Sequence, residues 1–128
     1  MVSPFGLAIV TADILDADYS AVCYSGHGII SGYSTGEKVT ESLMPDYYGL
    51  INKNSNYAYE WDFENNANDV VVINLGTNDS SYLSYGFEER SPEFITEYEK
   101  FLYDVRKKNP DAYIICTVGT MGGTEVYD

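Results

Sequence analysis

A run of seven residues, Asp69-Val70-Val71-Val72-Ile73-Asn74-Leu75, most constrains the folds that this chain of 128 residues can adopt. Most of its side chains are apolar and β-branched, and they lack the alternation with polar residues that is typical of a strand with one solvated face. The run therefore predicts a strand inside a sheet, covered on both faces. Gly76-Thr77-Asn78-Asp79 follows directly and predicts a sharp turn where the strand ends.

A helix and a second strand are predicted next. Ser91 is the expected N-cap, Pro92 takes the first helical position, and Asn109-Pro110 ends the helix behind the basic Arg106-Lys107-Lys108. The expected apolar face of this helix consists of Phe94, Ile95, Tyr98, Phe101, Leu102 and Val105. Residues 112–118 are again rich in β-branched side chains, so they predict another buried strand.

The N-terminal half predicts a helix, a short strand and a long irregular segment. The helical period is carried by Leu7, Val10, Thr11, Ile14 and Leu15, and Asp16-Ala17-Asp18 ends this helix. Residues 19–24 predict a strand that stops at the glycine loop Ser25-Gly26-His27-Gly28. Residues 29–68 show little pattern beyond a helical turn or two after Pro45. The order helix, strand, excursion, strand, helix, strand is typical of one α/β domain with a parallel sheet.

The charge balance excludes several classes of partner. Seven Lys and Arg residues against 20 Asp and Glu give a net charge of −13, which repels nucleic acid and anionic membrane surfaces. No apolar run approaches the roughly 20 residues that span a bilayer. One histidine and two cysteines, Cys23 and Cys116, form no cluster of metal ligands, so we expect no metal and no other cofactor. Both cysteines lie in predicted strands, where we expect buried free thiols rather than a disulfide.

Three glycine-bearing loops follow the predicted strands, at residues 25–28, 76–79 and 119–123. In parallel sheets, ligands bind beyond the carboxyl ends of the strands. A backbone N–H at Gly28 (or Gly26) and the side-chain amide of Asn78 could stabilise the oxyanion of an acyl-transfer reaction. The alternative is that the glycines only turn the chain, while Asn78 or Asp79 caps the next turn.

Three blocks carry a resemblance to a known family: YSAVCYSGHG at residues 19–28, VVINLGTND at 71–79 and ICTVGTM at 115–121. They resemble the SGNH, or GDSL-like, hydrolases, and most closely the family 2 carbohydrate esterases of the acetyl xylan esterase type. The resemblance covers nearly the whole chain. It implies a flavodoxin-like three-layer α/β/α fold around a parallel sheet, with Gly28 and Asn78 as the oxyanion hole.

The family's other two blocks are absent from this sequence. There is no Gly-Asp-Ser block for a nucleophilic serine and no Asp-x-x-His block for a catalytic histidine. The resemblance therefore implies that residues 1–128 are one esterase domain truncated at both ends, with the nucleophile and the base outside the chain. The implied activity is the removal of O-acetyl groups from plant polysaccharides by serine acyl transfer, with an acetylated oligo- or polysaccharide as partner and an extracellular or cell-surface location. We expect the chain alone to be inactive and poorly stable.

The chain also contains residues for two alternative sites that would be complete within it. Gly32-Tyr33-Ser34-Thr35-Gly36 matches the G-x-S-x-G nucleophile elbow, but it lacks a preceding strand and a later histidine. His27 could act as a base for Ser25 or Ser31, although a loop histidine bonded to backbone or solvent is the expected state. Outside esterase chemistry, the chain could be a non-catalytic carbohydrate-binding module or a flavodoxin-like interaction module.

The aromatic residues near these loops have two readings each. Trp61 could stack on a sugar ring, but a core anchor is the favoured interpretation. Tyr82 and Tyr85 follow Asn78 closely and could line the rim of a site, although exposed tyrosines are also common in loops without a function.

Overall fold

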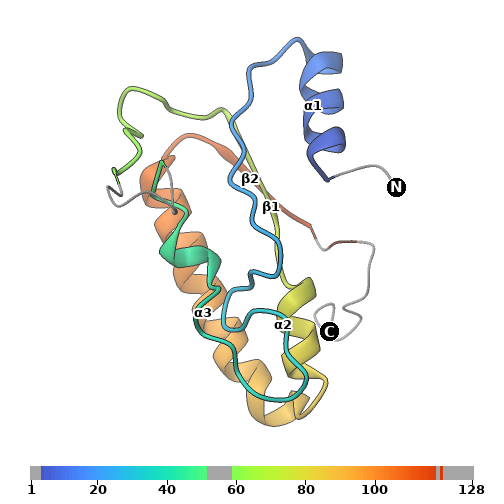
Figure 1. Ribbon diagram of the computed structural model, residues 1–128. Coiled ribbons are helices and arrows are strands. Elements are labelled where there is room, and N and C mark those ends of the chain that lie inside the picture. The colour runs from blue at the N-terminus through green and yellow to red at the C-terminus, as the bar shows by residue number, and fades with distance from the viewer. Residues whose placement is uncertain (1–3, 52–58, 118, 120–128) are drawn as a thin grey trace.

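The computed structural model describes residues 4–51, 59–117 and 119, and its elements follow an α/β order (Figure 1). The elements are α1 (Pro4–Leu15), the 3-10 helix η1 (Met44–Asp46), β1 (Val70–Asn74), α2 (Thr77–Leu83), α3 (Phe87–Lys108) and β2 (Tyr113–Thr117). The strands β1 and β2 pair in parallel, with Val70 opposite Tyr113 and Asn74 opposite Thr117. The predicted parallel sheet, the N-terminal helix and the helical turn near Pro45 are thus confirmed.

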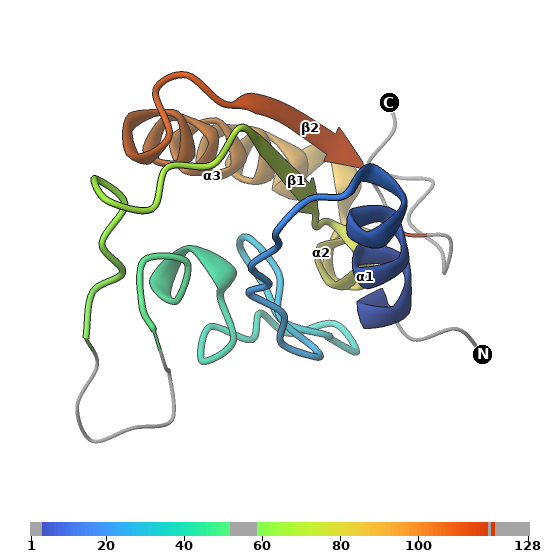
Figure 2. The same cartoon turned by 90° about the horizontal axis from the view of Figure 1, so that it is seen from above.

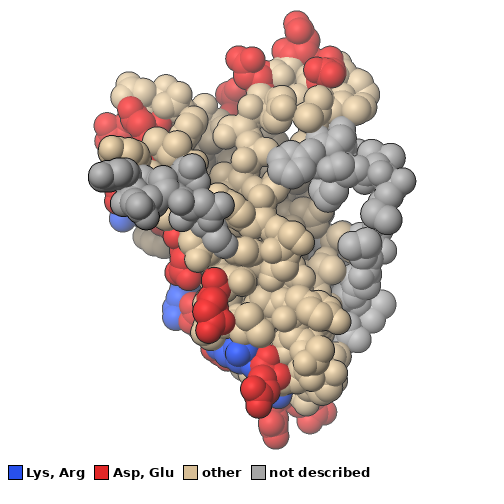
Figure 3. All heavy atoms as spheres, in the orientation of Figure 1, with Lys and Arg blue, Asp and Glu red and all other residues tan. Residues whose placement is uncertain are grey.

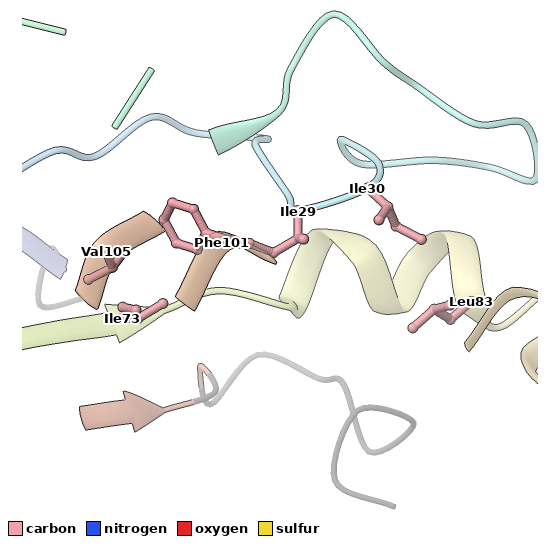
Figure 4. Close-up of a cluster of buried hydrophobic side chains, with 6 residues drawn as sticks. All are labelled: Ile29, Ile30, Ile73, Leu83, Phe101 and Val105. Atoms are coloured by element: carbon pink, nitrogen blue, oxygen red, sulfur yellow. The ribbon is translucent and has the colours of Figure 1, made fainter. Parts of the chain in front are cut away.

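The hydrophobic core lies between one face of the sheet and α3. Figure 2 shows α3 running alongside the two strands, and Figure 4 shows the side chains that meet there. The cluster consists of Ile29, Ile30, Ile73, Leu83, Phe101 and Val105, all buried. Two of its six members, Ile29 and Ile30, come from the segment that follows the first glycine loop. That loop is therefore anchored in the core by apolar side chains.

The other face of the sheet is exposed, so the prediction of strands covered on both faces is wrong. Val70 and Val72 are 50% and 61% exposed, and their register partners Tyr113 and Ile115 are 78% and 47% exposed. The reason is that the described helices cover only the face that carries Ile73 and its neighbours. A run of β-branched residues without alternation indicates a strand, but it does not show that helices cover both faces of the sheet.

Residues 19–24 form no strand in the structure, which corrects a second prediction. A strand needs a neighbour that completes its ladder of backbone hydrogen bonds, and no described segment pairs with these residues. Cys23 lies in this segment and Cys116 lies in β2, and both are free thiols. The absence of a disulfide between them is confirmed, but both are exposed, so the predicted burial is wrong.

The long helix α3 begins five residues earlier than predicted, at Phe87 instead of Pro92, so Pro92 lies inside it. Gly86 occupies the N-cap, and Pro92 removes one hydrogen bond to the exposed Glu88 carbonyl, which water can satisfy. The predicted C-terminal end is confirmed, because Asn109 is the C-cap behind the three basic residues. The predicted apolar face is confirmed except for Ile95, which is 56% exposed.

The surface carries its charge unevenly. Figure 3 shows acidic side chains gathered beyond the C-terminal end of α1 and mixed charges over α3, with a mostly uncharged region between them. None of the described helices is long and apolar enough to cross a membrane.

Trp61 is half-buried and is not a member of the core cluster, so its prediction as a core anchor is wrong.

Candidate functional site

The structure brings the first two glycine loops into direct contact. Asn78 lies at the start of α2, and its Nδ2 donates a hydrogen bond of 2.7 Å to the carbonyl oxygen of His27. The third loop begins beside them: a Cβ built on Gly119 would lie 3.0 Å from Oγ1 of Thr77. Residues 120–123 lie outside the described residues. The loops lie together as expected for the parts described, but only the second and third follow strands, because residues 19–24 form none.

Asp79 links the two loops more extensively than Asn78 does. Its side chain is 0% exposed, and its carboxylate accepts hydrogen bonds from three consecutive backbone N–H groups. Oδ1 accepts from Ile29 at 2.9 Å, Ile30 at 2.7 Å and Ser31 at 3.1 Å, and Oδ2 accepts from Ile29 at 2.9 Å. Burial raises the pKa of the Asp79 carboxyl, and the backbone donors oppose this rise. The sequence pointed to Asp79 only as a possible cap; its position beside Asn78 was the available signal.

Gly28 is packed tightly between these groups. A Cβ at this position would lie 1.9 Å from the carbonyl oxygen of Ser31 and 2.7 Å from Oδ2 of Asp79. Its N–H donates to the Ser42 carbonyl at 3.1 Å, and its carbonyl accepts from Met44 at 2.7 Å. The Gly28 N–H, predicted as an oxyanion donor, therefore has a backbone partner in this conformation.

Gly26, the alternative donor, has a different environment. Its φ of +77° lies in the left-handed region, and a Cβ built there would meet no atom within 4 Å. Its carbonyl accepts from the Tyr33 N–H at 3.1 Å, which closes the loop. The space beside Gly26 is open, whereas the space beside Gly28 is filled.

His27 is buried and bonded to the backbone, which confirms the expected state. Its Nδ1 lies 2.9 Å from the carbonyl oxygen of Ser25, and this atom donates when it carries the proton. Its ring lies 5.3 Å from the Tyr24 ring and 5.5 Å from the Tyr47 ring, measured between centroids. Ser31 is fully buried, and its hydroxyl bonds backbone groups of Gly32 and Val39. These contacts hold the loop together and do not form a nucleophile and base pair.

The nucleophile-elbow alternative does not form. Ser34 is buried, its Oγ donates to the carbonyl of Glu37, and it accepts the N–H of Gly36 at 2.9 Å. In the described residues, no strand precedes it and no helix follows it directly; the next helical element is η1, which begins at Met44. Ser34 therefore shapes a turn, as the missing structural context of the motif predicted.

The two tyrosines after Asn78 lie in different settings. The ring of Tyr82 is half-buried against the core, with the guanidinium of Arg90 4.0 Å from its centroid. Tyr85 is 58% exposed and lies within 3.7 Å of the position that a Cβ on Gly36 would take. Within the described ranges, no group of His, Cys, Asp and Glu side chains could hold a metal ion.

Comparison with known proteins gives a consistent picture. No family model matches the chain. The chain is 36% identical over 114 residues to the cellulase/esterase CelE of Acetivibrio thermocellus, a match that covers 89% of this chain and 13% of CelE. It is 29% identical over 113 residues to an acetylxylan esterase/glucomannan deacetylase of Cellvibrio japonicus, covering 88% of this chain and 30% of that protein.

The fold is shared with a solved family two carbohydrate esterase from Clostridium thermocellum, determined in complex with cellohexaose. The TM-score is 0.80 at 34% sequence identity, over 98% of this chain and 36% of the solved chain. The chain thus spans well under half of the length of each of these relatives. By sequence and by fold, the homologues and structural neighbours of this chain are thus carbohydrate esterases, and the solved ones belong to family two.

Proposed function

We propose that this chain is the oxyanion-hole portion of a carbohydrate esterase that removes O-acetyl groups from plant polysaccharides. The observation that carries the proposal is the contact between Asn78 and the first glycine loop, in a chain whose relatives are carbohydrate esterases. The partner is an acetylated oligo- or polysaccharide. Such a ligand is uncharged, which suits a chain with a net charge of −13.

The proposed chemistry divides the work between this chain and residues outside it. A serine hydroxyl attacks the acetyl carbonyl and a histidine takes its proton, so the carbonyl oxygen becomes an oxyanion. The Asn78 amide has two N–H groups, and one of them donates to His27, which leaves the second for the oxyanion. The other donor is a backbone N–H of the glycine loop, at Gly28 or at Gly26. Because the Gly28 N–H bonds Ser42, Gly28 can serve only if that bond is exchanged, whereas open space lies beside Gly26.

Replacing Asn78 tests the proposal in the esterase that contains this sequence. Loss of one oxyanion donor typically lowers kcat by ~10²–10³-fold, so we expect Asn78→Ala to show a loss of that size on p-nitrophenyl acetate and on acetylated xylan. Asn66→Ala is the matched control, because the amide of this exposed residue donates only within its own turn. An unchanged kcat in Asn78→Ala would refute the role of Asn78. The reading frame on both sides of residues 1–128 should encode Gly-Asp-Ser and Asp-x-x-His blocks.

A second candidate function is carbohydrate binding without catalysis. It is favoured by the solved relative from Clostridium thermocellum, which binds cellohexaose. Titration calorimetry with cellohexaose, combined with an assay of acetyl-ester turnover, separates the two proposals. A binding module would release heat on titration yet show no turnover of acetyl esters when the flanking blocks are present.

A further inference from the structure

The carboxylate of Asp79 occupies a site that the proposed chemistry does not use. It accepts hydrogen bonds from the N–H groups of Ile29, Ile30 and Ser31, which lie 48 to 50 residues earlier in the chain. Three consecutive backbone donors that converge on one carboxylate form a concave anion-binding arrangement. Here the anion is a side chain of the same protein, so the arrangement fixes the backbone that follows the first glycine loop.

The tight packing at Gly28 supports the same interpretation independently. A Cβ there would collide with both the Ser31 carbonyl and the Asp79 carboxylate, at 1.9 Å and 2.7 Å. The φ of Gly28 is not in the left-handed region, so backbone conformation does not explain the glycine. The close approach of the Ser31 carbonyl and of the Asp79 carboxylate explains it. Glycine at position 28 and aspartate at position 79 therefore form one unit.

The apolar contacts of Ile29 and Ile30 do not replace this role. Both side chains are 2% exposed and lie in the core cluster with Leu83 and Phe101, as Figure 4 shows. Such contacts are non-directional and hold the segment against the core. Hydrogen bonds to one carboxylate also set the direction of the peptide groups, because the N–H must point at the acceptor.

We propose that Asp79 is a positioning residue that holds the first glycine loop in register with Asn78. Asn78 and Asp79 are consecutive, so the residue that contacts His27 and the residue that binds the backbone of residues 29–31 share one turn of α2. The loop and the Asn78 amide therefore move as one body. This inference rests on the proposed function for its consequence in catalysis, but the geometry can be tested without any ester.

The test uses two substitutions of Asp79 that differ in what they retain. In Asp79→Asn, the remaining Oδ1 can still accept all three N–H groups, because only the second bond from Ile29 uses Oδ2. Asp79→Ala removes every acceptor and leaves buried N–H groups unpaired. Asp69→Ala is the control, since it removes the same charge from an exposed site next to β1.

The readout is amide hydrogen exchange by NMR in the full protein that the gene encodes, together with the side-chain NH₂ resonances of Asn78. In Asp79→Ala we expect exchange at residues 29–31 to accelerate by about 10–100-fold and the Asn78 resonances to shift, while the Ile73 amide in β1 keeps its rate. In Asp79→Asn and Asp69→Ala we expect exchange at residues 29–31 to stay within about threefold of the wild type.

Three results would overturn the inference. The first is that the amides at residues 29–31 exchange freely in the wild type. The second is that Asp79→Ala accelerates exchange equally at Ile73 and at residues 29–31. The third is that Asp79→Asn behaves like Asp79→Ala. The proposed function fails separately. If the exchange results are as expected but Asn78→Ala keeps its kcat, Asp79 positions the loop and the oxyanion role of Asn78 is wrong. In an active esterase, Asp79→Ala should lower kcat with little change in KM, and Asp79→Asn should restore most of it.

Discussion

At the scale of single residues, the two glycines of the first loop differ in a way that substitution can measure. A Cβ on Gly28 meets a backbone oxygen that cannot move aside easily, so we expect Gly28→Ala to lower the free energy of unfolding by about 3 kcal/mol. Gly26→Ala adds a methyl group in open space, at a φ of +77° that costs about 1 kcal/mol for an L residue. Urea unfolding followed by circular dichroism measures both.

Gly49→Ala provides the control for these two variants. Its Cβ would meet the Lys108 side chain at an ordinary 3.6 Å, and its φ is not in the left-handed region. We expect it to stay within about 0.5 kcal/mol of the wild type. If Gly28→Ala is as stable as Gly49→Ala, the packing of Gly28 against Ser31 and Asp79 is incorrect.

The sequence predicted the neighbourhood of the candidate site but not its hydrogen bonds. The expected closeness of Gly28 and Asn78 agrees with the 2.7 Å bond from Asn78 to His27, although its premise, a strand over residues 19–24, is wrong. The full burial of Asp79 could not be predicted. The N–H groups that bind its carboxylate come from a segment that lies 48 to 50 residues earlier and shows no periodic pattern. Local patterns carry no information on such a contact.

At the scale of elements, the start of α3 is the sharpest difference between prediction and structure. Ser91-Pro92 is a favourable N-terminal signal, yet the helix starts at Phe87 and tolerates the proline near its N-terminal end. At residues 19–24, by contrast, the predicted element does not form at all. Their β-propensity is real, but a strand exists only where a neighbour completes the ladder. Propensity therefore located these segments but did not decide their boundaries or their pairing.

Replacing Pro92 distinguishes the two possible starts of α3. If the helix begins at Phe87, Pro92→Ala restores the hydrogen bond to the Glu88 carbonyl, and we expect a stabilisation of about 1 kcal/mol or more in thermal unfolding. If Ser91 is the N-cap instead, Pro92 is well placed at the first helical position, and the same change gives no gain. Pro110→Ala lies beyond the C-cap and serves as the control, with no stabilisation expected.

At the scale of the whole molecule, the exposed face of the sheet dominates the expected behaviour in solution. Val70, Val72, Tyr113 and Ile115 form one contiguous apolar surface on neighbouring strands. Exposed apolar patches and unpaired strand edges promote association between chains. We therefore expect the isolated chain of 128 residues to be poorly stable and to associate as its concentration rises.

Polar substitutions on the two faces of β1 should have opposite effects. Val72→Thr changes a side chain that is 61% exposed, so we expect weaker self-association in sedimentation velocity and little change in the unfolding midpoint. Ile73→Thr introduces the same hydroxyl group, but the Ile73 side chain lies in the core and is only 5% exposed. Burying a hydroxyl there should lower the free energy of unfolding by about 2–3 kcal/mol without reducing self-association. A monomeric chain with a cooperative melt at high temperature would contradict this account. It would mean that the apolar face of the sheet is covered in solution, so that the exposure of Val70 and Val72 is not a property of the folded protein.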